Sequence, residues 1–188
     1  MSISILGGHA KGHALLVPKG TLIRPTSVML RRRFFDAYQD MSGLTFVDLC
    51  AGTGAMGLEA LSRGANKVYL NEFHPKVYQL LKKNVSSMTR DLGHSLGSVE
   101  SSKGSCLDFI KSHKEQLDKT DTFIFFDPPY EDHKLYKDVL KVLHDFDQAK
   151  IIIETDKQKG IKEEEITKLN YKIKKSYRQG TSYIYIAE

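Results

Sequence analysis

Between residues 44 and 154, short apolar stretches alternate with longer stretches in which apolar residues recur at helical spacing. A short apolar stretch bounded by turn residues predicts a buried strand, and the longer amphipathic stretches predict helices. Strands are predicted at 45–49, 67–72, 98–102, 122–126 and 150–154, and helices at 55–64, 75–85, 105–117 and 133–146. Residues 86–97 are polar and are expected to form a loop or, in part, a helix tail. The alternation predicts an α/β fold in which a mostly parallel sheet carries helices on both faces.

Both ends of the chain depart from this alternation. Residues 171–177 and 181–188 flank a short turn and predict a closing antiparallel hairpin. Residues 1–20 contain two short apolar stretches around a turn rich in glycine and histidine, which predict a small hairpin outside the main sheet. A helix is expected to follow, with Thr26 as its N-cap and its end near Gln39.

This N-terminal helix combines apolar and basic residues. Helical spacing gives it a predicted buried face of Leu30, Phe34, Ala37 and Tyr38. Successive helical residues are rotated by about 100°, so three consecutive arginines cannot share one side. We expect Arg31 and Arg33 to flank the buried face and Arg32 to point away from it.

The chain has 188 residues, which suits one domain with a sizeable core. Its apolar stretches are all shorter than the roughly 20 residues that span a bilayer, and its N-terminus lacks the features of a signal peptide. Cys50 and Cys106 provide neither a disulfide framework nor metal-ligand spacing. We therefore expect a cytoplasmic protein without a metal and, because no long exposed apolar stripe is apparent, a monomer.

Positive charge is concentrated in two segments of a chain whose net charge is +5. Residues 171–180 are one basic segment, and residues 1–35 contain no aspartate or glutamate but carry Lys11, Lys19, Arg24, Arg31, Arg32 and Arg33. With an isoelectric point near 9.0, this clustering indicates a polyanionic partner. A basic surface that is merely solvated is the alternative, and the charges alone do not decide between the two.

The sequence DLCAGTGAMG, residues 48–57, connects the first predicted strand to its helix. Its glycines give the pattern G-x-G-x-x-G, which permits a tight turn and close approach of a ligand to the backbone. Glu72 ends the next strand, where a carboxylate can accept hydrogen bonds from a ribose. A tight turn that binds nothing has the same pattern, and both NAD and S-adenosylmethionine contain a ribose. Asp48 either orients the loop or approaches an ammonium group, and the second role favours S-adenosylmethionine because a pyrophosphate gains nothing from a carboxylate.

The carboxyl ends of neighbouring parallel strands line one crevice of such a sheet. Gly52, Gly54, Glu72, Asp108 and Asp127 are therefore expected to converge on one pocket. Asp108 stands near the start of a predicted helix, where it either contacts an adenine or is simply solvated.

Residues 127–130, Asp-Pro-Pro-Tyr, follow an apolar strand. Two consecutive prolines allow neither a helix start nor a continuing strand, so they fix a rigid corner. The exocyclic amine of a nucleobase is a poor nucleophile, because its lone pair is delocalised into the ring. Asp127 and a proline carbonyl, that of Pro128, can be preorganised acceptors that free this lone pair, and Tyr130 can stack on the base. A rigid turn capped by a surface aspartate is the alternative. Methyl transfer from a sulfonium requires neither a metal nor a covalent enzyme intermediate.

Together these motifs resemble the amino-methylating branch of the Rossmann-like S-adenosylmethionine-dependent methyltransferases. The flanking sequences ISILGGHAKGHALLVP, LIRPT and RQGTSYIYI are similar to the bacterial 16S rRNA guanine-N2 methyltransferase family. The resemblance extends from about Ile3 to Ile186. It implies a class I methyltransferase fold with a seven-stranded sheet, S-adenosylmethionine as cofactor, and 16S rRNA or the small ribosomal subunit as partner.

The resemblance also implies roles for individual residues. Asp127, Pro128, Pro129 and Tyr130 would grip the target guanine. The methyl donor would be held by Asp48, Cys50, Ala51, Gly52, Gly54 and Glu72, with Cys106, Leu107 and Asp108 near its adenine. Residues 1–40 would form an RNA-contacting extension and residues 41–188 the methyltransferase domain. Within the extension, we expect RNA contacts from Lys11, Lys19, Arg24, Arg31, Arg32 and Arg33.

The chain departs from the family at Val28 and Arg32, which replace acidic residues and make the helix more cationic. Three other functions remain open. An adenine-N6 methyltransferase acting on DNA or RNA would share residues 127–130, although 188 residues leave little room for a target-recognition domain. A non-catalytic RNA-binding assembly factor would have a vestigial pocket. An NAD-dependent oxidoreductase would use the glycine-rich loop but leave the Asp-Pro-Pro-Tyr corner unexplained.

Overall fold

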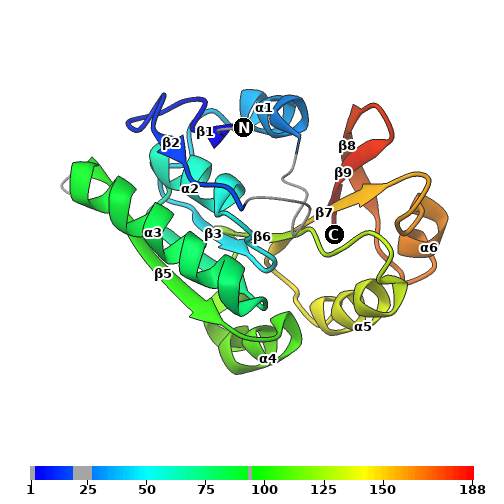
Figure 1. Cartoon of the computed structure of the whole chain (residues 1–188). Coiled ribbons are helices and arrows are strands. Elements are labelled where there is room, and N and C mark those ends of the chain that lie inside the picture. Colours follow the sequence, from blue (N-terminus) through cyan, green and yellow to red (C-terminus); the bar gives the residue numbers. More distant parts are fainter. Residues whose placement is uncertain (1–2, 19–26, 93–94) are drawn as a thin grey trace.

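The computed structural model describes residues 3–18, 27–92 and 95–188. Its main element is a seven-stranded sheet with the strand order β5-β4-β3-β6-β7-β9-β8 (Figure 1). The strands β5, β4, β3, β6 and β7 are parallel, and β9 and β8 complete the sheet as an antiparallel pair. Their bounds are β3 (Thr45–Asp48), β4 (Lys67–Glu72), β5 (Ser98–Lys103), β6 (Thr122–Phe126), β7 (Lys150–Asp156), β8 (Ile173–Gln179) and β9 (Ser182–Ala187). The predicted fold class is thereby confirmed.

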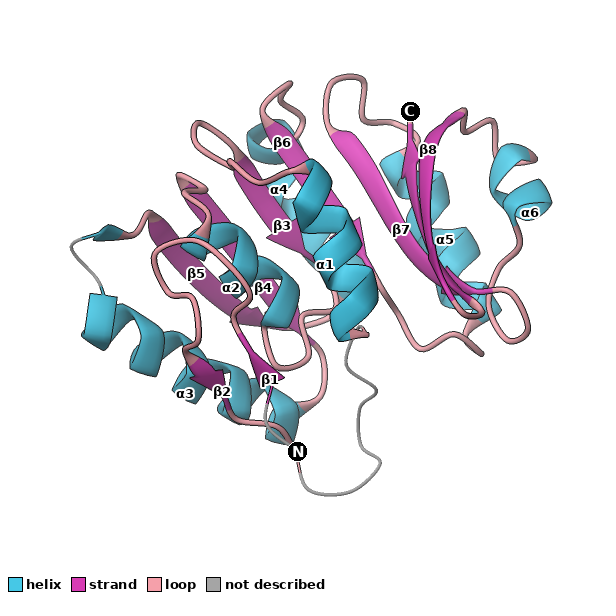
Figure 2. Ribbon diagram, turned by 90° about the horizontal axis from the view of Figure 1, so that it is seen from above, coloured by secondary structure: helices cyan, strands magenta, loops and turns pink. Residues whose placement is uncertain are grey.

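Helices cover both faces of this sheet (Figures 1 and 2). One face carries α1 (Val28–Ala37), α2 (Ala55–Ser62) and α3 (Pro75–Leu92), and the other carries α4 (Cys106–Leu117), α5 (His133–Leu143) and α6 (Glu163–Thr167). Each layer of helices closes its own apolar core against the sheet. Because both faces are covered, a central strand such as β6 is buried along its whole length, and four of its five residues are apolar. No helix in the described part of the chain is long and apolar enough to cross a membrane.

Two helices differ from the sequence-based expectation. α3 continues to Leu92, because Val85, Met88 and Leu92 extend its apolar face into the core. α6 lies in a segment for which the sequence pattern predicts no helix. Its first turn consists of three glutamates, Glu163–Glu165, whose charges are favourable at a helix N-terminus.

α1 is rotated relative to its predicted buried face. Leu30, Arg31, Phe34 and Phe35 are buried, whereas Ala37 is exposed. The two phenylalanines pack edge to face with ring centroids 5.0 Å apart, so the helix turns its aromatic residues rather than Ala37 inward. Ser27 is the N-cap in place of the predicted Thr26, since its Oγ accepts a hydrogen bond from Leu30 N at 3.0 Å.

The predicted N-terminal hairpin is present as a separate two-stranded sheet of β1 (Ile3–Ser4) and β2 (Ala14–Leu15). Its apolar residues Ile3, Ile5, Ala10 and Leu15 are buried and belong to the same core as α1 and α2. The hairpin therefore lies over the α1–α2–α3 face, beside α3 (Figure 2).

The sheet has a switch point between β3 and β6. From β3 the chain adds β4 and β5 on one side, and it then returns to add β6 and β7 on the other. At such a point the loops after the two strands diverge and leave room for a ligand at their carboxyl ends. Asp48 lies in register with Phe125 of β6, so Asp48 and Asp127 reach the same edge of the sheet.

Candidate active site

Glycines shape the loop between β3 and α2. Gly52 and Gly54 have φ angles of 55° and 86°, in the left-handed region that residues with side chains rarely adopt. A Cβ atom on Gly57 would lie 2.3 Å from Leu70 Cδ2 of β4. The first two glycines thus permit the turn, and the third permits close packing of α2 on the sheet.

Glu72, at the end of β4, holds this loop in place. Its Oε2 accepts a hydrogen bond from Gly52 N at 2.8 Å, and its Oε1 accepts one from His74 N at 2.7 Å. The side chain is nearly buried. Because each carboxylate oxygen has a further lone pair, Glu72 retains acceptor capacity for ligand hydroxyls. The structure therefore brings Gly52 and Glu72 together, as the sequence predicts.

Asn71 joins the loops that follow β3 and β5. Its Nδ2 donates to Leu49 O at 3.2 Å and to Gly104 O at 3.0 Å, and its backbone oxygen accepts from Ala51 N at 2.8 Å. The amide is buried, and Ser102 Oγ donates to its Oδ1 at 2.9 Å. Sequence reasoning missed Asn71, although an asparagine inside a buried strand is itself a signal of a polar network.

Cys50 and Cys106, which follow the two strands joined by Asn71, are in contact. Their hydrogen bond, followed by burial, raises the pKa of Cys50 well above its usual value. The same hydrogen bond lowers the pKa of Cys106. The start of α4 therefore adjoins the glycine-rich loop. Within α4, Leu107 is half-buried, and Asp108 is exposed in the first turn.

Asp48 is the most unusual titratable group of the site. It is 2 % exposed, and its Oδ1 has no hydrogen-bond partner among the described residues. Burial raises the pKa of Asp48 to about 8, and the neighbouring carboxylates of Asp127 and Glu72 add to the increase. The backbone amides of Gly57 and Cys50 partly oppose this shift. Three carboxyl groups thus converge, and a buried acceptor without a donor is costly, so the site suits a cationic ligand.

The Asp-Pro-Pro-Tyr corner follows β6 and turns toward β7. Asp127 is half-buried, Pro128 is buried and Pro129 is exposed. Tyr130 Oη donates to Glu154 Oε1 of β7 at 3.0 Å. Burial, followed by the charges of Glu154 and Asp127, raises the pKa of Tyr130 well above its usual value. Glu154, which sequence reasoning missed, therefore orients the tyrosine.

Two further residues near the site were not predicted. Phe73 follows Glu72 and is 75 % exposed, an unusual position for a large apolar side chain at the end of a central strand. Asn84 of α3 is buried, and its Nδ2 donates to Thr53 O of the glycine-rich loop at 2.9 Å. The position of Phe73 directly after Glu72, which ends a predicted strand, could have marked it as a site residue. No local sequence feature marks Asn84.

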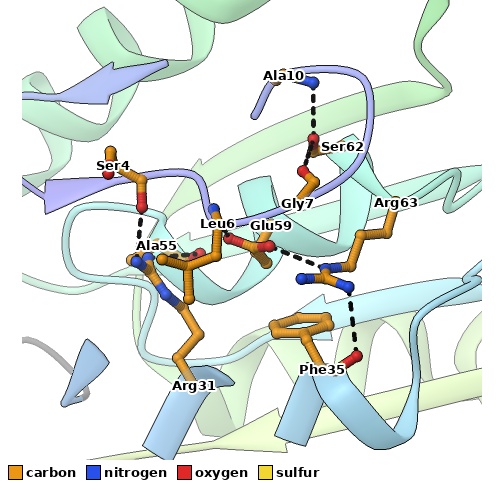
Figure 3. Close-up of polar contacts among 10 residues, drawn as sticks. All are labelled: Ser4, Leu6, Gly7, Ala10, Arg31, Phe35, Ala55, Glu59, Ser62 and Arg63. Atoms are coloured by element: carbon orange, nitrogen blue, oxygen red, sulfur yellow. Dashed lines mark hydrogen bonds and ion pairs between the residues drawn. The ribbon is translucent and has the colours of Figure 1, made fainter. Parts of the chain in front are cut away.

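Arg31 is not available to RNA, so its predicted RNA contact is wrong. It is 1 % exposed, and its Nη2 donates to Ser4 O at 2.7 Å (Figure 3). Burial lowers its pKa, and the charge of Glu59 opposes this change. Rather than flanking the buried face of α1, Arg31 is part of it and anchors the hairpin.

Glu59 of α2 is the centre of this anchor. Its Oε2 accepts from Leu6 N at 2.7 Å, and its Oε1 accepts from Arg63 Nε at 2.8 Å (Figure 3). One turn away, Ser62 Oγ donates to Gly7 O at 2.6 Å and accepts from Ala10 N at 2.8 Å. The hairpin is thereby fixed to the helix that begins at the glycine-rich loop.

The remaining predicted RNA contacts are exposed where the structure describes them. Lys11 lies in the turn of the hairpin, and Arg32 and Arg33 lie on the outer side of α1. Arg33 Nη1 donates to Arg178 O of β8 at 2.7 Å, which joins the two basic segments of the sequence. Lys19 and Arg24 fall outside the described residues.

Comparisons with known proteins agree with this arrangement. The model of the family described as Conserved hypothetical protein 95 matches residues 3–186. The ribosomal RNA small subunit methyltransferase D of Haemophilus influenzae is 31 % identical over 166 residues, which cover 85 % of this chain and 81 % of that protein.

Two solved structures show the same fold. The Escherichia coli putative methyltransferase yhhF has a TM-score of 0.74 at 24 % identity, covering 100 % of this chain and 97 % of that one. Trm1 of Pyrococcus horikoshii, in complex with S-adenosyl-L-methionine, has a TM-score of 0.68 at 12 % identity, covering 100 % of this chain and 60 % of that one. The chain therefore belongs to the Conserved hypothetical protein 95 family and to the bacterial 16S rRNA methyltransferase family that its motifs resemble.

Proposed function

We propose that this protein transfers a methyl group from S-adenosylmethionine to the exocyclic N2 amine of a guanine in 16S rRNA. The observation that carries the proposal is the convergence of Asp48, Glu72 and Asp127 at the switch point of a methyltransferase fold. Asp127, Glu72 and an Asp48 carboxyl group that a bound cation would help to ionise favour a ligand with an ammonium and a sulfonium group over a dinucleotide with a pyrophosphate. The named rRNA methyltransferase relative supports the substrate class.

The residues of the glycine-rich side fit S-adenosylmethionine. Asp48 Oδ1, buried without a donor among the described residues, would accept a hydrogen bond from the ammonium group of the donor. Glu72 would accept hydrogen bonds from the ribose hydroxyls. Phe73 offers an exposed apolar ring beside them, and Leu107 and Asp108 would border the adenine from α4. The bound donor supplies an electrophilic methyl group on sulfur.

The residues of the Asp-Pro-Pro-Tyr corner would act on the acceptor amine. Asp127 and the carbonyl of Pro128 would accept hydrogen bonds from the two N–H groups of the amine, which leaves the nitrogen lone pair directed at the methyl group. The two prolines restrict the corner, so little ordering is needed during the reaction. The hydrogen bond from Tyr130 to Glu154 would hold the aromatic ring at a fixed angle for stacking on the base.

The RNA would be bound by the N-terminal extension, which we assign to residues 1–40, with residues 41–188 as the methyltransferase domain. Its proposed phosphate contacts are Lys11, Lys19, Arg24, Arg32 and Arg33. The substrate would be 16S rRNA or the small ribosomal subunit, and the enzyme would act in the cytoplasm as a monomer. The attachment of the N-terminal hairpin to α2 would keep the RNA in a constant position relative to the methyl donor.

The test is incubation of the purified protein with labelled S-adenosylmethionine and small ribosomal subunits from a strain that lacks it. Nucleoside analysis is expected to yield N2-methylguanosine, and the Asp127→Ala variant is the inactive control. N6-methyladenosine would instead support the adenine methyltransferase. Donor binding without methylation of subunits or naked rRNA would support the non-catalytic assembly factor.

A further inference from the structure

One side of α3 is a continuous polar and cationic surface. Its members recur three or four residues apart and surround an open hollow of about 440 Å³; they are Gln79, Lys82, Lys83, Ser86, Ser87 and Arg90. The buried residues of the helix, which include Leu81 and Met88, lie on the opposite side. This surface, named here the α3 face, exposes ammonium, guanidinium, hydroxyl and amide donors.

The lysines of the α3 face make no ion pair with any residue that the structure describes. Among the described residues, the charged contacts of α3 centre on Asp91, which lies 3.2 Å from Arg90 and 3.8 Å from His13, whereas Lys82 and Lys83 have no ion pair. Lys82 Nζ instead lies 5.3 Å from the ring centroid of Tyr78. Exposed lysines without a paired carboxylate create a positive potential that attracts an anion.

The opposite face of the sheet has a different charge pattern. On α5, Lys134 lies 3.6 Å from Asp138, and Lys137 lies 3.3 Å from Glu165 of α6. Charges of both signs therefore alternate on the α4–α5–α6 face, while the hairpin, α1 and α3 carry mainly positive charge. A polyanion would approach the molecule from the α1–α2–α3 side.

The α3 face also adjoins the elements already assigned to substrate binding. α3 begins at Pro75, three residues after Glu72, the last residue of β4. Asn84 ties it to the hairpin, because its Oδ1 accepts from Leu16 N at 2.8 Å and its Nδ2 donates to Leu16 O at 3.0 Å. In Figure 2, α3 runs alongside β2 on the outer side of the sheet. One extended RNA strand can therefore contact the hairpin and α3 together.

We propose that the α3 face binds backbone phosphates of the RNA substrate and extends the RNA-binding surface beyond the N-terminal residues. This inference rests on the proposed function. Lysine is a point charge for a phosphate, and hydroxyl and amide groups add hydrogen bonds to its oxygens. Such contacts fix the position of the RNA but read no base, so sequence selection is left to the active site.

The experiment compares two variants with the same change of charge. Lys82→Ala/Lys83→Ala alters the α3 face, and Lys111→Ala/Lys141→Ala removes two exposed lysines from α4 and α5 on the other side of the sheet. RNA affinity is measured over a potassium chloride series with a 16S rRNA fragment. Loss of two phosphate contacts should reduce the log–log salt slope by about 1.4–1.8 and weaken binding at 0.1 M salt by roughly 25-fold or more. The control variant should match the wild type.

Donor affinity, measured by calorimetry, separates this inference from the proposed function. If the wild type neither binds S-adenosylmethionine nor methylates rRNA, the proposed function fails. If the wild type does both but the α3 variant keeps the wild-type salt slope and RNA affinity, the inference is overturned. Unchanged binding to naked RNA with reduced methylation of assembled subunits would also overturn it, since the partner of the α3 face would then be a ribosomal protein.

Discussion

Asp48 is a carboxyl group that the folded chain keeps largely protonated at neutral pH, because its pKa is raised to about 8 by burial and by Asp127 and Glu72. In the unfolded chain its pKa returns to about 3.9. At pH values between about 4 and about 8, the folded state therefore binds a proton that the unfolded state does not. This group makes the free energy of unfolding decrease as pH rises from about 4 to about 8.

Replacing Asp48 by asparagine should remove this pH dependence. The stability of Asp48→Asn relative to wild type should increase from pH 5 to pH 8 by roughly 2–5 kcal/mol. Urea unfolding at several pH values measures the difference. Asp108→Asn, which changes an exposed carboxyl group of α4, is the control for removal of one charge. Parallel pH profiles for Asp48→Asn and wild type would contradict the assignment.

Substitutions at Glu72 and Asp127 should affect different steps: donor binding at Glu72 and methyl transfer at Asp127. Glu72→Ala leaves the amides of Gly52 and His74 without their acceptor and should weaken donor binding by on the order of 2–4 kcal/mol. Asp127→Ala should bind the donor normally but lose most of its methyl-transfer activity. Asp127→Asn should lose less activity, because its amide oxygen still accepts one hydrogen bond.

Calorimetry and single-turnover methylation measure these two effects independently. A folded Glu72→Ala variant with wild-type donor affinity would remove Glu72 from the site. Wild-type turnover by Asp127→Ala would refute the proposed activation of the amine.

At the scale of elements, the hairpin is held on α2 by a buried charge cluster. Glu59 is fully buried between the guanidinium groups of Arg31 and Arg63 and also accepts a backbone hydrogen bond from Leu6 (Figure 3). Removing one partner from such a cluster leaves an uncompensated buried charge. The resulting loss of stability is larger than the net stabilisation that the intact cluster provides.

Glu59→Gln keeps the shape of the side chain but removes its charge, and should destabilise the protein by about 3 kcal/mol. The loss should appear as faster hydrogen exchange at Leu6 and Ala10, whose amides bond to the Glu59 and Ser62 side chains. Glu100→Gln, which alters an exposed ion pair with Lys67, is the control and should change stability by less than about 1 kcal/mol. Unchanged exchange at Leu6 in Glu59→Gln would show that the apolar contacts of the hairpin suffice.

At the scale of the whole molecule, basic residues near the N-terminus should contribute to RNA binding through charge alone. The triple variant Lys11→Ala/Lys19→Ala/Arg32→Ala should weaken RNA binding and flatten its salt dependence by up to about one log–log unit per lost contact. Donor affinity should be unchanged, because none of these residues belongs to the proposed donor site. Arg31→Lys is the contrasting variant. Because Arg31 is buried, this substitution should lower the stability of the protein without changing the salt dependence of RNA binding.

A salt series for the triple variant that parallels the wild type, with equal affinity, would show that this basic segment is only solvated. The RNA would then dock elsewhere, and the basic hairpin of β8 and β9 would be the first surface to examine. Arg33 already links that hairpin to α1.

Much of the fold follows from local sequence patterns. The five parallel strands and the helices after the first four of them are predicted within a few residues, except for the end of α3, because apolar periodicity directly reflects which faces are buried. Glycine and proline positions are equally local: positive φ angles at Gly52 and Gly54, and the corner at Pro128 and Pro129, depend on the residues themselves. Motif spacing also predicts that Glu72 meets the glycine-rich loop.

Other features were decided only by the tertiary structure. Arg31, which sequence spacing places beside the buried face of α1, is part of that face. It is buried because α1 turns Phe35 inward, because Ser4 O and Ala55 O accept hydrogen bonds from its guanidinium, and because the charge of Glu59 is nearby. Asn71, Asn84 and Glu154 act through partners that are distant along the chain, such as Leu16, which is 68 residues from Asn84. Local sequence determines which shapes a segment can adopt, whereas the environment of a buried polar group is set by contacts that exist only after distant segments have packed together.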